Sequence, residues 1–170
     1  MRKNVFKGTG AFIVTHIIVT GICMLLVGYG FFFKLQPLFL SVYRSGNLFL
    51  LFLYILLNSL PISLIYFLFS CLWAKLLKIE NEIRALIIVL VIGEFMLLAG
   101  WLLITSLMLP GDQLAGFLEI FINAPAGWVL NRVNFYDRKA LVTALLYILP
   151  PIAHVSGIYV SSRLSRKKNG

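Results

Sequence analysis

The sequence of 170 residues has little charge: 12% of its residues are Asp, Glu, Lys or Arg, whereas 61% are hydrophobic. Soluble domains carry roughly a quarter charged residues, about twice the share found in this chain. The shortage excludes an ordinary water-soluble fold and indicates that lipid surrounds most side chains. Because each helical span needs about 20 apolar residues, the chain has room for roughly four to six spans and for no soluble domain beside them.

Other scarce residues exclude several kinds of site. The two cysteines, Cys23 and Cys71, lie in apolar segments, which is typical of small hydrophobic thiols and not of a disulfide framework or a zinc motif. The sequence also lacks the H-E-x-x-H and G-x-S-x-G motifs and a glycine-rich phosphate loop. We therefore expect no enzyme activity, no cofactor and no dedicated metal site.

Four uninterrupted apolar segments are each long enough to cross a bilayer as a helix: 11–33, 48–73, 85–109 and 138–161. They are continuous and do not alternate with polar residues, which excludes the strands of a lipid-facing barrel. The first segment is longer than the apolar part of a signal peptide and no cleavage site follows it, so we expect it to be retained. The sequence predicts an all-α fold, a polytopic membrane helix bundle with four transmembrane helices in a single integral membrane domain, 1–170.

The basic residues predict the orientation of the bundle. With an even number of spans both termini share a side, and that side would hold ten of the 15 basic residues: Arg2, Lys3, Lys7, Lys75, Lys78, Arg84, Arg163, Arg166, Lys167 and Lys168. The opposite side would hold the other five: Lys34, Arg44, Arg132, Arg138 and Lys139. This asymmetry predicts N and C termini in the cytoplasm of a bacterial-type cell membrane. The net charge of +9 is thus a topology signal, and no nucleic-acid partner is expected.

Two connecting segments carry further patterns. Between the second and third spans, Lys78/Glu82 and Glu80/Arg84 are four residues apart, which predicts that helical structure continues there. In the outer loop 111–137, residues 113–122 have the apolar spacing of a short amphipathic helix, and Asp137 is placed to cap the fourth span. Segment 113–135 has two interpretations: an interfacial hairpin at headgroup depth, or a re-entrant loop that lines a cavity.

Three ionisable residues inside the spans are the candidate polar cluster: Glu94, His16 and His154. Their expected depths agree within roughly 6 Å at about 1.5 Å rise per residue, so they are able to meet if their helices face one another. A carboxylate beside two imidazoles can relay protons, because His titrates near neutral pH, or the trio can bind a metal. A hydrogen bond between Glu94 and one histidine, or a backbone carbonyl, is the purely structural alternative.

Proline and small residues mark other positions within the spans. Pro61, Pro150 and Pro151 each remove a helical hydrogen bond, and His154 is close enough along the chain to donate to the carbonyls freed by Pro150 and Pro151. Small residues spaced by four predict a helix-contact face: Ala153, Gly157 and Ser161. Hydroxyl groups form a stripe on the second span: Ser59, Ser63, Tyr66 and Ser70. These faces pack the helices against each other or contact a partner.

Three functions follow from these features. The first is an accessory, immunity or scaffold subunit that acts through intramembrane helix contacts, with the lipid bilayer around it and a membrane protein partner or a second copy beside it. The alternative is an ion- or proton-coupled carrier or channel component that uses Glu94, His16 and His154. The third is an intramembrane metal enzyme built on the same three residues.

Overall fold

The computed structural model describes residues 1–28, 41, 46–80, 82–107 and 139–168. Within these ranges the chain forms four α-helices and no strand: α1 (Arg2–Gly28), α3 (Leu48–Leu76), α4 (Ile83–Leu107) and α7 (Lys139–Lys168). The predicted all-α class with four helices is therefore confirmed. The outer loop 111–137, with its expected short helix and the Asp137 cap, lies outside the described residues.

Each predicted apolar segment coincides with a helix, but two helices extend well beyond the expected bounds. The helix α1 begins at Arg2 instead of residue 11, and α7 continues to Lys168 instead of ending at 161. Hydropathy marks the apolar part of a helix, whereas the backbone hydrogen bonds that define its ends continue through Lys, Arg and Ser, which are tolerated in helices.

The amino end of α3 is capped by Asn47. Its side-chain oxygen accepts hydrogen bonds from the backbone N–H groups of Phe49 at 3.0 Å and Leu50 at 3.2 Å. These are donors that have no partner within the helix, and Asn is among the residues preferred at this position. The cap explains why the helix begins at Leu48.

A left-handed residue ends α3. Lys78 has φ of +50°, and the backbone N–H of Ile79 reaches back to the Ala74 carbonyl at 3.0 Å. The Lys78 N–H also contacts the Lys75 carbonyl at 3.4 Å, which completes a Schellman motif. Helical structure does continue past the expected spans, to Leu76 in α3 and from Ile83 in α4. It is interrupted at Lys78, because a residue with positive φ cannot continue a right-handed helix.

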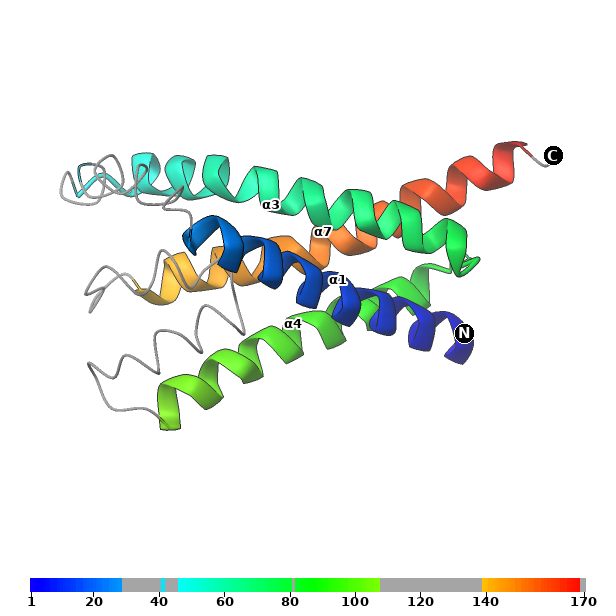
Figure 1. Cartoon of the computed structure of the whole chain (residues 1–170), viewed down its shortest axis with the longest axis horizontal. Helices are drawn as coiled ribbons and strands as arrows, with labels where there is room; N and C mark the ends of the chain where they lie inside the picture. Colours follow the sequence, from blue (N-terminus) through cyan, green and yellow to red (C-terminus); the bar gives the residue numbers. More distant parts are fainter. Residues whose placement is uncertain (29–40, 42–45, 81, 108–138, 169–170) are drawn as a thin grey trace.

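The four helices lie beside one another, and the chain reverses at each end (Figure 1). The most extensive contact joins α3 and α7, while α1 packs against α3 and α4, and α4 also packs against α7. Both termini lie at the same end of the molecule as the connection between α3 and α4 (Figure 1). This placement agrees with the even number of crossings on which the predicted topology depends.

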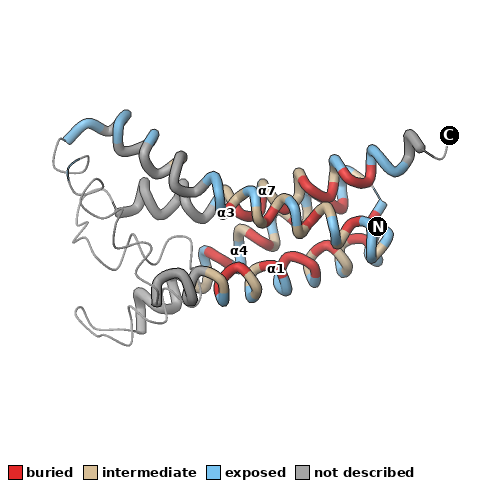
Figure 2. Tube along the Cα trace, turned by 45° about the horizontal axis from the view of Figure 1, so that its top comes forward, coloured by how far each residue is buried: buried red, intermediate tan, exposed pale blue. Residues whose placement is uncertain are grey.

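Buried residues follow the sides of the helices that face each other (Figure 2). They include Phe12, Val19 and Ile158, and also the polar residues Thr15, Ser70 and His154. Large apolar side chains, in contrast, are exposed on the outward faces of all four helices. Among the described residues, Arg2–Ile22 and Ile83–Gly100 are long and apolar enough to cross a membrane, and Leu60–Leu76 is a shorter apolar helix.

Candidate functional site

His154 of α7 connects three helices. Its side chain is fully buried, and both ring nitrogens have partners. Nδ1 lies 2.5 Å from Oγ of Ser70 on α3, and Nε2 lies 3.1 Å from the carbonyl oxygen of Gly8 on α1. One imidazole therefore holds α7 to both α3 and α1 at the same level of the bundle.

The partners of His154 determine where its protons lie. A carbonyl oxygen only accepts, so Nε2 carries a hydrogen and donates it to Gly8. The Ser70 hydroxyl lies 2.6 Å from the Tyr66 carbonyl oxygen as well, and it has one proton to donate. In neutral His154 the hydroxyl donates to Nδ1; in the imidazolium form Nδ1–H donates to Oγ and the hydroxyl donates to the carbonyl. The heavy-atom arrangement thus suits both protonation states.

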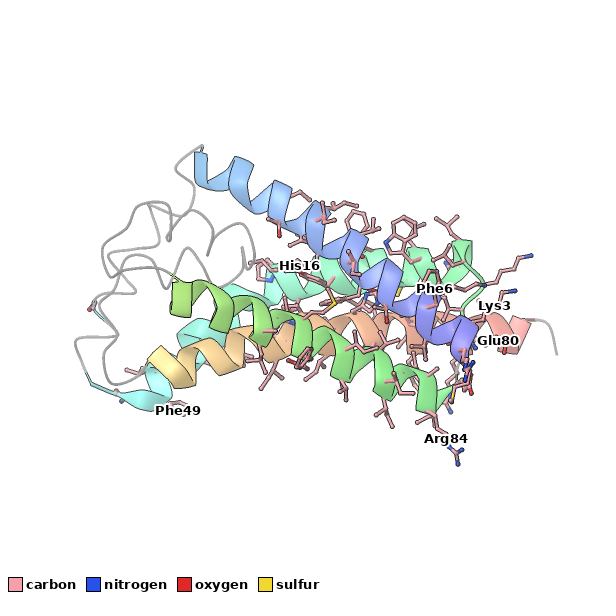
Figure 3. All side chains as sticks on the ribbon, turned by 90° about the horizontal axis from the view of Figure 1, so that it is seen from below. Lys3, Phe6, His16, Phe49, Glu80 and Arg84 are labelled. Atoms are coloured by element: carbon pink, nitrogen blue, oxygen red, sulfur yellow. The ribbon has the colours of Figure 1, made fainter. Side chains whose placement is uncertain are left out.

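The second histidine, His16 of α1, is half-buried and points toward α3 (Figure 3). Its Nδ1 lies 2.5 Å from the hydroxyl oxygen of Tyr66, which is fully buried. Tyr66 and Ser70 are four residues apart on α3, and therefore on one face of that helix. This face of α3 therefore contacts both histidines: Tyr66 contacts His16, and Ser70, one turn further on, contacts His154.

Phe12 lies between the two histidines. Its ring stacks on the ring of His16, with centroids 6.0 Å apart and planes 23° apart. The edge contact with His154 has a centroid distance of 5.3 Å and an angle of 71°, and Tyr66 lies 6.1 Å away. We call this group the histidine cluster: Phe12, His16, Tyr66, Ser70 and His154. The structure thus brings His16 and His154 to one aromatic ring, although no hydrogen bond between them is described.

Glu94 of α4 is placed differently. It is half-buried, and its Oε2 atom is inaccessible and has no hydrogen-bond partner. The neighbouring Gly93 packs closely on the cluster side, because a Cβ there would lie 3.4 Å from the Phe12 ring and 3.3 Å from Pro151. Within the described part of the chain no three His, Cys, Asp or Glu side chains are grouped to hold a metal ion. Glu94 and the two histidines therefore do not form a ligand set.

The small residues of α7 face α3. A Cβ added to Gly157 would collide with the Phe67 carbonyl oxygen and would lie 2.9 Å from Cβ of Ser70. The Ser161 hydroxyl donates to the carbonyl oxygen of Cys71 at 3.1 Å, and the Cys71 thiol donates to the Gly157 carbonyl at 3.3 Å. This face thus packs against another helix of the same chain, with backbones in direct contact.

The three prolines lie inside continuous helices, Pro61 in α3 and Pro150 and Pro151 in α7. Pro61 is exposed, whereas Pro150 and Pro151 are fully buried and Pro151 faces Gly93 of α4. The expectation that His154 donates to the carbonyls freed in α7 is wrong, because both of its nitrogens contact other helices.

Sequence reasoning missed part of the histidine cluster. The hydroxyl stripe on the second span included Tyr66 and Ser70, and it was the available signal for both. Phe12 and Gly8 carry no comparable signal, since one is an ordinary apolar residue and the other contributes through its carbonyl oxygen. Only the relative rotation of the helices shows that they contact His154.

The chemistry open to the cluster is limited by its burial. A serine hydroxyl beside an imidazole is the arrangement of a nucleophile and its base. Ser70 is, however, fully buried, and the backbone of α7 at Gly157 covers it. The arrangement therefore joins three helices, and the Ser70 hydroxyl lies inside the bundle. Comparison with protein-family models, curated proteins and solved structures found no match to the chain.

Proposed function

We propose that this chain is an integral membrane protein with four transmembrane helices and cytoplasmic termini, which acts as an accessory, immunity or scaffold subunit through helix contacts in a bacterial-type cell membrane. The observation that carries the proposal is the distribution of polarity: hydroxyl, amide and imidazole groups are buried, and large apolar side chains are exposed. A soluble protein of this size has few contiguous apolar patches on its surface.

The outward faces are apolar along the length of the helices. On α3, five exposed leucines repeat every four residues: Leu60, Leu64, Leu68, Leu72 and Leu76. On α4 the same spacing exposes Ile83, Ile87, Val91 and Phe95. Lipid acyl chains are the solvent that suits such surfaces. Inside, Ser70, His154 and Ser161 hydrogen-bond to other helices, as polar groups in membrane bundles do.

The lengths and charges of all four helices support four spans. They contain 25 to 30 residues each, or roughly 38 to 45 Å at about 1.5 Å per residue, which exceeds a hydrocarbon core of about 30 Å. Residues 48–74 of α3 and 140–162 of α7 contain no Asp, Glu, Lys or Arg. Ten of the basic residues belong to the end where both termini lie, which supports a cytoplasmic orientation for that end.

The closed interior supports a subunit role. The hydroxyl and imidazole groups of the histidine cluster hydrogen-bond to neighbouring helices. The protein would then act through its outer surfaces, which are apolar and suited to contact with the helices of another membrane protein.

Three experiments test this proposal. Alkaline carbonate extraction of host membranes should leave the full-length protein in the pellet, and its release into the supernatant would show that it is not integral. Purification in mild detergent with gentle crosslinking should yield an oligomer or a co-purifying membrane protein, whereas a strictly monomeric species without a partner contradicts the subunit role. Cysteine introduced at position 170 should be protected from an impermeant reagent in intact cells.

A second candidate, an ion- or proton-coupled component, is favoured by one observation. The buried Oε2 of Glu94 has no hydrogen-bond partner, while His154 is held in a way that suits either protonation state. Intramembrane ionisable groups commonly mark ion or proton pathways. Proton flux into liposomes should then fall with Glu94→Gln and stay unchanged with Glu80→Gln. Equal flux in both variants would exclude a proton-coupled function. Metal analysis of protein purified without added metal decides the third candidate, a metal enzyme.

A further inference from the structure

The end of the bundle that holds both termini has an exposed basic surface. It receives residues from all four helices and from the turn after α3: Arg2, Lys3, Lys75, Lys78, Arg84 and Arg163. Figure 3 shows Lys3, Arg84 and Glu80 together at this end, with Phe49 at the opposite end. We call these six residues the basic rim.

Few acidic groups compensate the basic rim. Glu80 and Glu82 are the acidic residues of this end. The Glu82 carboxylate lies 3.1 Å from the Met1 amino group and 3.3 Å from the Asn4 side-chain nitrogen. Two hydrogen bonds hold the pKa of Glu82 below its usual value, mainly the one from the Met1 amino group and secondly the one from Asn4. Glu82 is therefore negatively charged, and its carboxylate interacts with these two groups. The positive charge of the rim is therefore available to an external anion.

The Arg163 side chain is held by contacts with Tyr159. Its Nη1 donates to the hydroxyl oxygen of Tyr159 at 3.1 Å, and its guanidinium carbon lies 5.8 Å from the centre of the same ring. The side chain is exposed, so its other N–H groups remain open to a ligand. A guanidinium held in this way is suited to bidentate contact with a phosphate. The helix α7 continues to Lys168, which adds Arg166, Lys167 and Lys168 within the next turn and a half.

Four of the six basic residues of the rim have an exposed apolar residue nearby along the chain. Leu76 follows Lys75, Ile83 precedes Arg84, and Leu164 follows Arg163. Phe6, three residues after Lys3, is 83% exposed. A ligand that satisfies this pattern has an anionic group next to a hydrocarbon part. Nucleic acids lack a hydrocarbon part, and an acidic peptide has one only where its sequence includes apolar side chains, whereas an anionic phospholipid always has both.

We propose that the basic rim, with Arg163 as its ordered phosphate-binding residue, binds the headgroups of anionic phospholipids. The inference rests on the proposed membrane location and adds to it the class of lipid that this end recognises. The interaction is electrostatic at the headgroup, where each Lys or Arg adds about 1 kcal/mol of attraction to an anionic surface. It therefore weakens with salt.

The test uses purified full-length protein in mild detergent with equal amounts of phosphatidylglycerol and phosphatidylcholine, and native mass spectrometry to count the bound lipids. Wild type should retain phosphatidylglycerol preferentially. A variant with Gln in place of four residues of the basic rim, Lys3, Lys75, Arg84 and Arg163, should lose at least about fivefold of that preference. Arg163→Lys, which keeps the charge, should lose only part of it.

The matched control removes four charges from the other end: Lys34, Arg44, Arg132 and Lys139, each changed to Gln. Its lipid preference should equal that of wild type, and circular dichroism should show the same helical content in all variants. Equal binding of both lipids by wild type, or an equal loss in both quadruple variants, overturns the inference. So does binding of an acidic peptide or RNA in place of lipid. None of these results affects the carbonate-extraction test. The lipid-binding inference can therefore be disproved without disproving the membrane location.

Discussion

Ser70 Oγ and His154 Nδ1 lie 2.5 Å apart between α3 and α7, and Nε2 of the same imidazole contacts the carbonyl oxygen of Gly8 on α1. Ser70, His154 and Gly8 come from three different helices, and the side chains of Ser70 and His154 are fully buried. These contacts therefore fix the relative rotation of three helices. In the proposed bilayer, apolar contacts alone would perform this role poorly, because lipid is equally apolar.

Ser70→Ala should destabilise the bundle by about 1 to 2 kcal/mol. The change leaves Nδ1 of His154 buried without a partner, and interhelical hydrogen bonds in membrane proteins contribute up to about 1.7 kcal/mol. The free energy of unfolding in mixed micelles, measured against rising dodecyl sulfate, checks the prediction. Ser63→Ala is the matched control, because Ser63 is half-buried on the same helix, and it should change the free energy little.

A double-mutant cycle with His154→Leu separates the pair from the individual side chains. The two substitutions should be less than additive, because the second removes a group that has already lost its partner. Strict additivity would show that the short distance between Ser70 and His154 contributes nothing to stability.

The sequence could predict the helices because their signals are local. Long apolar segments specify helix in lipid whatever surrounds them, and α3 begins at Leu48, as expected. The start of α1 was missed because residues 2–10 are polar. They remain helical while Asn4 and Gly8 are buried in the bundle and Lys7 donates to the Leu77 carbonyl. The end of α3 was missed because a lysine occupies a position where glycine is the usual signal.

The candidate site could be predicted only in part, since depth follows from sequence and helix rotation does not. Lipid-facing and core-facing residues are both apolar in a membrane bundle, so hydropathy does not reveal which face of α4 carries Glu94 inward. The sequence groups Glu94 with His16 and His154 only because the three residues have similar expected depths in the membrane. In the structure both histidines contact Phe12, and on α4 a Cβ at the neighbouring Gly93 would lie 3.4 Å from that ring.

Gly157→Ala should destabilise the protein by about 1 to 3 kcal/mol, the usual effect of overpacking. The added methyl group would collide with the Phe67 carbonyl oxygen, which belongs to the backbone of α3 and cannot rotate away. Gly10→Ala is the control, because nothing lies within 4 Å of a Cβ at that position. It should be neutral or stabilise α1 by up to about 1 kcal/mol. Unfolding in mixed micelles distinguishes the two, and equal effects would contradict the close approach of α3 and α7.

Lys78→Gly should stabilise the protein by about 0.5 to 1 kcal/mol. Lys78 has φ of +50°, a conformation that is unfavourable for residues with a Cβ and accessible to glycine without strain. Lys75→Gly removes the same charge from the last turn of α3, where the backbone is helical, and should destabilise by about 1 kcal/mol. Thermal unfolding followed by circular dichroism in detergent compares the variants. A lower midpoint for Lys78→Gly would show that the lysine side chain contributes more than its backbone conformation costs.

Glu82→Gln should reduce stability near neutral pH and have a smaller effect in acid. Hydrogen bonds from the Met1 amino group and Asn4 lower the pKa of Glu82 from its ordinary value of 4.5. Because the folded-state pKa is the lower one, the carboxylate stabilises the folded state fully above about pH 4.5, and this contribution is lost as the pH falls through the lowered pKa. The difference in unfolding free energy between wild type and Glu82→Gln should therefore decrease from about pH 6 to about pH 3. Glu80→Gln, at an exposed carboxylate in the same turn, is the control for the loss of one negative charge. A constant difference for Glu82→Gln across this range would mean that its contacts with Met1 and Asn4 do not depend on its charge.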